Sequence, residues 1–286
     1  MHKGRRNSMI VLGVVVGIVL LVLVFFALPY SKTHKEFSKA TDVLISDAGV
    51  SDELFTLDDI ASLPLPVQKF FIHCQFIGKP KMTYMKATFK DVDFSLGREK
   101  STIKIDYVQY NGVTKPQRLA YIDSSLYGIP FEGFDSYLGG TGAMLGRIAK
   151  VIALFDQRGV DMDRACLATF LAEALFVPSA ALQPYIQWEA MDDTHASATI
   201  EAYGITCSGI FSFSEEGEML SFVTDDRMAT GMDGKKEQVQ WTAILADYTM
   251  QGNLLLPSTL QAVWNYPEGD LLCFDGKDVA IEYVSR

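Results

Sequence analysis

The chain has 286 residues, of which 49% are hydrophobic, and its formal net charge is −10 at pH 7. This length can bury the core of one large domain or of two small ones. The acidic balance argues against nucleic acid as a partner and against tight electrostatic docking on anionic lipid headgroups.

A membrane-spanning helix is the first predicted element, over residues 9–30. Its run MIVLGVVVGIVLLVLVFFAL has no charged residue, and such a helix spans about 30 Å, the thickness of the hydrocarbon core. Residues 1–8 form a basic tail, so the positive-inside rule predicts a cytoplasmic N-terminus, a single pass through the cell membrane and an extracytoplasmic C-terminal domain. A cleaved signal peptide is the alternative, but the apolar run is long for one and FFALPYSK lacks a clean cleavage site.

A juxtamembrane linker with helical tendency is predicted over residues 31–61. Within it, Thr56 and Asp59 resemble a capping box that begins a short helix. Pro64 and Pro66 follow, and their fixed φ suits the first turn of another helix. The apolar residues after them recur at i, i+3, i+4 and i+7, which predicts one buried stripe of an amphipathic helix: Val67, Phe70, Phe71 and Cys74.

The hydrophobic period then changes to two, which predicts β-strands. Clear alternation occurs at 103–107, 205–213, 239–245 and 279–283. In the first strand the buried parity changes, which predicts a bulge near Lys90 and Asp91. Turn sequences separate the strands, and Asp275-Gly276 is typical of a tight hairpin.

One further helix is predicted from Asp161 to Phe176, capped by Asp161 or Asp163 and ended by Pro178. Its apolar stripe consists of Leu167, Phe170, Leu171, Ala174 and Leu175. Strands on both sides of this helix predict an α+β fold for residues 62–286, a large antiparallel β-sheet or half-barrel with helices packed on one face. The transmembrane helix precedes this extracytoplasmic β-rich domain.

The predicted domain contains few residues of the kinds that catalyse reactions or bind metals. His73 and His195 have no partner at zinc-ligand spacing, and we interpret both as structural or solvated. The sequence has no G-x-S-x-G, H-E-x-x-H or C-x-x-C motif. We therefore predict no metal, no cofactor and no named catalytic residue, and the chain is more typical of a binding protein than of an enzyme.

Two other features leave alternatives open. The glycine-rich GGTGAMLG at 139–146 lacks the lysine of a phosphate-binding loop, and we interpret it as a mobile loop or a strand bend. The four cysteines allow one or two disulfides in an exported domain, although free core thiols are the simpler interpretation: Cys74, Cys166, Cys207 and Cys273.

Two segments resemble the signatures of an uncharacterised prokaryotic membrane-anchored family, a domain of unknown function. LPLPVQKFF at 63–71 is similar to the family's entry motif LPxPVQRYF. LAEALFVPSAALQPYIQWEAMDD at 171–193 is similar to its second signature, AEAxWFPxAL followed by Trp-Glu, with Phe176-Val177 in place of Trp-Phe. The resemblance covers about residues 60–286 and implies an exported, membrane-tethered domain. By fold analogy, such a sheet resembles the half-barrels of periplasmic lipoprotein carriers, which bind acyl chains on a concave apolar face.

The aromatic residues give the functional hypothesis. An antiparallel sheet whose apolar face is only partly covered leaves a site for a lipid or another apolar small molecule. The predicted ligand-binding residues are Trp188, Trp264, Phe170, Tyr266 and, as the polar contact for a headgroup, Arg227. One alternative is a cell-envelope protein-interaction or structural module with a filled core and a protein partner. The second alternative is a carboxylate-dependent hydrolase.

Overall fold

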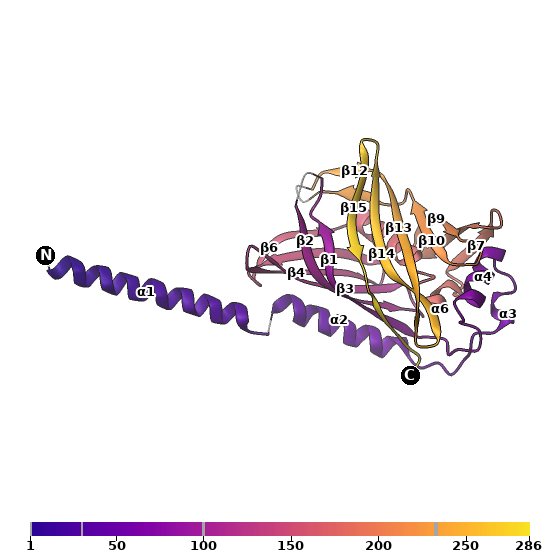
Figure 1. Ribbon diagram of the computed structural model, residues 1–286, viewed down its shortest axis with the longest axis horizontal. Helices are drawn as coiled ribbons and strands as arrows, with labels where there is room; N and C mark the ends of the chain where they lie inside the picture. The colour runs from indigo at the N-terminus through magenta and orange to yellow at the C-terminus, as the bar shows by residue number, and fades with distance from the viewer. Residues whose placement is uncertain (1, 30, 99–100, 232–233) are drawn as a thin grey trace.

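The computed structural model describes residues 2–29, 31–98, 101–231 and 234–286, with side chains from residue 7 onward. Figure 1 shows a curved β-sheet from which the first helix projects. The helices are α1 (His2–Ala27), α2 (Lys32–Ala48), α3 (Leu57–Ile60), α4 (Leu65–His73), α5 (Val160–Ala172) and α6 (Pro178–Ala181). The strands are β1 (Tyr84–Ser95), β2 (Thr102–Gly112), β3 (Gln117–Leu126), β4 (Ile129–Leu138), β5 (Thr141–Ile148), β6 (Ile152–Arg158), β7 (Ile186–Ala190), β8 (His195–Ala202), β9 (Ile205–Phe213), β10 (Met219–Thr224), β11 (Met228–Thr230), β12 (Lys236–Gln238), β13 (Gln240–Gln251), β14 (Leu254–Tyr266), β15 (Gly269–Gly276) and β16 (Ala280–Val284).

The described residues form one 14-stranded sheet in the order β6-β5-β4-β3-β2-β1-β15-β14-β13-β10-β9-β8-β7, with β16 beside β1. β11 and β12 form a separate pair. The predicted bulge in β1 is confirmed, because the register with β2 shifts between Phe89 and Val92. The predicted tight hairpin at Asp275-Gly276 is wrong. β15 pairs with the second half of the long strand β1, and β16 pairs with its first half. Both run antiparallel to β1, so the chain keeps its direction after Asp275-Gly276 and does not turn back on itself.

Helices cover both faces of the sheet, as the alternating side chains of β3 show. Leu119 faces outward, where Phe37 and Leu44 of α2 pack against it. Arg118 and Ala120 face inward, toward α5 and the main core. The α+β fold with a large antiparallel sheet is confirmed, and α4, α5 and α6 contribute to the core on the inner face. α2, from the predicted juxtamembrane linker, adds a helix on the outer face.

The proline-containing segment begins a helix, as predicted. Pro64 is the N-cap of α4, and Phe70 and Phe71 are buried in the main core. The capping box of α3 is also formed, with the Thr56 and Asp59 side chains each accepting from the other's backbone N–H. Both helices therefore begin where local sequence dictates.

α5 lies inside the curve of the sheet and is buried on nearly all sides. Its predicted stripe is buried, but so are Ala165, Cys166 and Ala168 on other faces of the helix. The helix contacts β5 near one edge of the sheet and β9 near the other. It ends at Ala172, before the predicted Phe176. A helix enclosed in this way loses the amphipathic contrast that would define a single buried face.

The glycine-rich segment lets α5 approach β5 closely. It forms the turn after β4 and most of β5. A Cβ on Gly142 would lie 2.7 Å from the carbonyl oxygen of Met162 in α5, which is too close for a real side chain. The Gly142 N–H donates to Asp163 Oδ1 at 2.6 Å. Asp163 therefore joins α5 to β5 and does not cap the helix, whose N-cap is Gly159.

Candidate functional site

One arginine lies against two tryptophans on the inner face of the sheet. Trp241 of β13 and Trp264 of β14 are cross-strand partners, so their side chains are neighbours on one face. The guanidinium carbon of Arg227, which precedes β11, is 4.2 Å from the ring centroid of Trp241 and 5.2 Å from that of Trp264. Both distances are within the range of a cation–π interaction. We call Arg227, Trp241 and Trp264 the arginine–tryptophan group.

The Arg227 side chain has unused hydrogen-bonding capacity. Its Nε is buried and has no hydrogen-bond partner among the described residues. Burial lowers the pKa of Arg227 from its ordinary value, and the negative charge of Asp135 opposes part of this shift. Arginine nevertheless stays protonated near neutral pH. The group therefore offers a positive charge and a free donor inside the protein, which a ligand with an acceptor oxygen could use.

Arg118 of β3, which is buried, differs from the half-buried Arg227 because its donors are paired. Its Nε is 2.9 Å from Glu173, its Nη1 is 2.6 Å from Asp135, and its Nη2 donates to the Tyr107 hydroxyl at 2.7 Å. Burial alone would lower the pKa of Arg118, but the charges of Glu173 and Asp135 raise it well above its ordinary value. This network joins the residue that ends α5 to the inner face of the sheet, so its role is structural.

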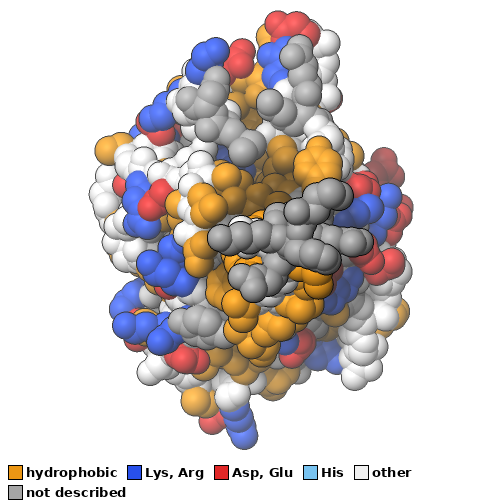
Figure 2. All heavy atoms as spheres, turned by 90° about the vertical axis from the view of Figure 1, so that its left-hand side faces the viewer, with side chains coloured by type: hydrophobic (Ala, Val, Ile, Leu, Met, Phe, Trp, Pro, Cys, Tyr) orange, Lys and Arg blue, Asp and Glu red, His pale blue; other side chains and the backbone are white. Residues whose placement is uncertain are grey.

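Half-buried apolar side chains extend the inner face beyond the arginine–tryptophan group. Phe94 of β1, Ile103 of β2, Met144 of β5 and Phe155 of β6 pack against the main core and stay partly exposed. Figure 2 shows the domain from the side on which α1 projects: its surface is hollowed above α1, and hydrophobic side chains line the hollow. Apolar walls with a few polar groups are typical of a site for an apolar ligand.

Three of the predicted ligand-binding residues lie in or beside the arginine–tryptophan group. Arg227 and Trp264 are in direct contact. Tyr266 is two residues farther along β14, where the Arg98 guanidinium lies 4.4 Å from its ring centroid. Sequence reasoning missed Trp241, although its strand alternates clearly, because only the register of β13 with β14 shows that it lies beside Trp264.

The other two predicted residues lie elsewhere in the core. Trp188 is on β7, the strand at one end of the sheet, where its indole N–H donates to the Ala181 carbonyl at 2.9 Å. Its ring packs on Phe211, with centroids 4.9 Å apart. Phe170 of α5 is buried against Tyr185. The structure therefore places these two residues apart from the arginine–tryptophan group, and their part in ligand binding stays a prediction.

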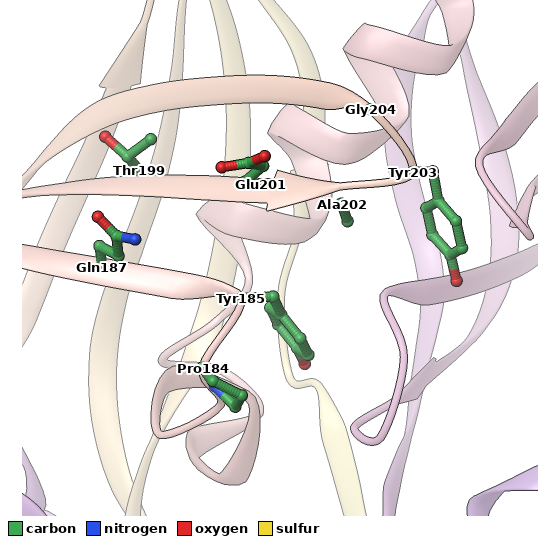
Figure 3. A pocket seen from close by; sticks show the side chains of 8 residues that line it. All are labelled: Pro184, Tyr185, Gln187, Thr199, Glu201, Ala202, Tyr203 and Gly204. Carbon is green, nitrogen blue, oxygen red and sulfur yellow. The ribbon is translucent and has the colours of Figure 1, made fainter.

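A pocket of about 250 Å³ lies near one end of the sheet (Figure 3). It is lined by Pro184, Tyr185, Gln187, Thr199, Glu201, Ala202, Tyr203 and Gly204. A second hollow, of about 560 Å³, lies beside α3 and α4 and is lined by Leu57, Ile72, Gln75, Ile77 and Lys79. Neither is lined by a member of the arginine–tryptophan group or by another residue that the sequence predicts to bind the ligand.

Two of the four histidines, His73 and His195, pair with carboxylates. His73 is 3.8 Å from Glu218, and His195 is 2.9 Å from Asp192. No cluster of three His, Cys, Asp or Glu side chains that could hold a metal ion occurs within the described ranges. The four cysteines are free thiols. The arginine–tryptophan group thus offers non-covalent recognition: a cation, a hydrogen-bond donor and two aromatic faces.

No curated protein matches the sequence. Among solved structures, the chain is similar to a LolA superfamily protein from Nitrosomonas europaea, with 8% identity and a TM-score of 0.40, over 76% of this chain and 93% of that one. It is also similar to a DUF1329 family protein from Desulfovibrio piger, with 9% identity and a TM-score of 0.36, over 78% of this chain and 94% of that one. Residues 53–276 match the model of a family of unknown function, DUF6544, and include both segments on which the resemblance rests. Because this match covers most of the sequence, the chain belongs to the DUF6544 family of unknown function.

Proposed function

We propose that the chain is a membrane-anchored, extracytoplasmic binding protein for a lipid or a similar molecule that joins an apolar chain to a polar headgroup. The observation that carries this proposal is Arg227, which lies against two tryptophans and whose buried Nε has no hydrogen-bond partner in the part of the chain that the structure describes. A carboxylate or phosphate headgroup would accept a charge-assisted hydrogen bond there. The tryptophans and the half-buried strand residues would contact the apolar chain.

The anchor is supported by α1. Near the N-terminus the described residues contain one helix long and apolar enough to cross a membrane, and its most apolar window is fully exposed. An apolar helical surface that protein leaves exposed is stabilised by lipid. The basic tail before it favours a cytoplasmic N-terminus, which would leave the sheet on the extracytoplasmic side of the cell membrane.

Binding of a fluorescent fatty-acid probe to the full-length chain in amphipol tests the proposal. The wild-type chain should bind the probe at micromolar concentrations. Arg227→Met should weaken binding about tenfold or more, because a hydrogen bond to a charged group contributes about 1.5–3 kcal/mol. Arg158→Met is the matched control, since this exposed arginine pairs with Asp156, two residues away. Absence of binding to the wild-type chain, or an equal loss in both variants, would refute the proposal.

A protein-interaction module of the cell envelope is the second candidate. It is favoured by the filling of the interior, where Phe170, Leu171 and Phe176 are buried within the main core. Native mass spectrometry of the gently extracted chain separates the two candidates. A binding protein for lipids should carry a small molecule that solvent extraction removes, whereas an interaction module should carry a protein and no such molecule.

A further inference from the structure

Two neighbouring hairpin tips expose large apolar side chains. Between β3 and β4 the tip is Tyr127, whose side chain is fully exposed, followed by Ile129. Between β5 and β6, Val151 and Ile152 are 66% and 58% exposed, and Leu154 is exposed farther along. We call these five residues the tip patch. The hairpins are adjacent, because the Ala149 N–H donates to the Pro130 carbonyl at 2.7 Å.

The turns that carry the tip patch have unfavourable backbone conformations. Tyr127 has φ of 53°, and Ala149 and Lys150, which precede Val151, have φ of 53° and 64°. These are left-handed conformations that turns usually assign to Gly, Asn or Asp. The chain instead places an exposed tyrosine at the first of these turns, where a small polar residue would fold with less strain and better solubility. An exposed tyrosine at this turn is therefore a candidate for contact with a partner.

The second tip touches the end of α1. The Lys150 ammonium group donates to the Leu28 carbonyl oxygen, and it lies 6.0 Å from the ring centroid of Phe25. The turn is therefore level with the last residues of the apolar helix. Two further contacts hold the hairpin beside the start of α2: Arg147 Nη1 lies 2.7 Å from Glu36 and 3.1 Å from the Thr33 hydroxyl.

We propose that the tip patch binds the interfacial layer of the bilayer that α1 spans and so holds the domain against that membrane. The inference rests on the proposed anchoring of α1. If the apolar run ends at Leu28, then Lys150 lies at the boundary between hydrocarbon and headgroups. Tyrosine is typical of this layer, and lysine can bury its stem there while its charge stays in the polar region. The turn backbones, which need water or polar headgroups, reach no deeper than the interface.

Apolar contact, and not charge, would provide the attachment. The chain is acidic overall, which argues against anionic lipid as the main attraction. Because α1 already tethers the domain, the tips act at high effective concentration, and a few side chains suffice. The arrangement also deepens the proposed function: the hollow of Figure 2 opens on the side of the domain where α1 projects. A lipid could then pass between the bilayer and the inner face of the sheet without crossing bulk water.

Depth-dependent quenching on the full-length chain in phosphatidylcholine vesicles tests this inference. An environment-sensitive fluorophore is placed on Val151→Cys and, as a control, on Met250→Cys, an exposed position in β13. Cys273→Ser in both chains removes the one native cysteine that is not buried. Lipids that carry a nitroxide near the headgroup should quench the Val151 label at least twofold more than the Met250 label.

Two further measurements separate loss of the docking from loss of the membrane anchor. Val151→Asp with Ile152→Asp, in a chain labelled at Tyr127→Cys, should abolish quenching of that label, because charged tips leave the interface. Equal quenching at the Val151 and Met250 positions would overturn the inference. Flotation of the chain with the vesicles is scored separately: a chain that floats but shows equal quenching keeps the anchor and loses the docking, whereas a chain that does not float loses both.

Discussion

Glu173→Leu would remove the carboxylate that joins the end of α5 to the inner face of the sheet. Glu173 accepts a hydrogen bond from Arg118 Nε at 2.9 Å and another from Asn111 at 2.7 Å, and all three residues are buried. The variant leaves both donors without this acceptor, while Asp135 still pairs with Arg118. Breaking a buried ion pair costs about 3–5 kcal/mol. Because Asp135 keeps the guanidinium partly paired, we expect the free energy of unfolding to fall by about 3 kcal/mol.

Urea unfolding of the full-length chain in detergent micelles, followed by tryptophan fluorescence, measures this change. Glu201→Leu, at an exposed position of β8, is the control and should stay within about 0.5 kcal/mol of wild type. A double-mutant cycle with Arg118→Met should give a coupling energy of about 1–3 kcal/mol, since the second substitution removes a donor whose partner is already gone. Equal, small losses for the Glu173 and Glu201 variants would refute the view that this network holds α5 in place.

Two further predictions concern stability. Leu171→Ala should lower the free energy of unfolding by about 2–5 kcal/mol, because this fully buried leucine lies in a helix enclosed by the sheet, where a cavity cannot collapse. A loss below about 0.5 kcal/mol in urea unfolding would mean that this face of the helix is exposed. Burial alone would raise the pKa of Asp59, but hydrogen bonds with Lys81 and Thr56 lower it below its ordinary value of 3.8. The stabilisation from this carboxylate is therefore complete above the unfolded pKa and is lost as pH falls through the lower native pKa. Asp59→Asn should flatten this part of an acid-unfolding curve; a variant that keeps the wild-type pH dependence would contradict the assignment.

Features that depend on neighbouring residues could be predicted from the sequence. Pro64 fixes φ at the start of α4, and the bulge near Lys90 follows from a change of parity within one strand. Features that join distant segments could not. The pairing of β1 with both β15 and β16, and the packing of Phe37 on Leu119, depend on register and on curvature of the whole sheet. For the same reason Asp275-Gly276 has the residues of a tight turn but lies in an extended segment.

The same distinction applies to the candidate site. Arg227 and Trp264 could be selected from the sequence because each is a residue type that binding sites use. The local sequence does not show which tryptophans lie side by side in the sheet. Trp188 and Trp264 are both on strands, yet β7 and β14 are five strands apart in the sheet order. Trp241 and the Arg118 network become visible only once strand register is known. Residue type thus gives candidates, and sheet topology decides which of them meet.

Replacing Arg118 and Arg227, each in turn, by methionine should give opposite results, and the contrast tests why Arg227 is retained. Arg118→Met leaves Glu173 and Asp135 without their cation and should cost about 3–5 kcal/mol in the free energy of unfolding. Arg227→Met loses cation–π contacts of about 0.5–1 kcal/mol each. It also relieves the desolvation of a buried donor, about 1–3 kcal/mol, so the net change should lie between about 1 kcal/mol of destabilisation and about 2 kcal/mol of stabilisation.

Thermal and urea unfolding of both variants in the full-length chain provide the measurement, with probe binding as the second readout. An arginine that adds little stability but keeps its Nε buried is retained for another purpose, and binding a ligand headgroup is such a purpose. If Arg227→Met destabilises the domain as much as Arg118→Met does, then Arg227 holds the fold together, and its unpaired Nε no longer points to a ligand. If Arg227→Met leaves stability intact and abolishes probe binding, then the desolvation of this arginine is a cost that the protein bears in order to bind.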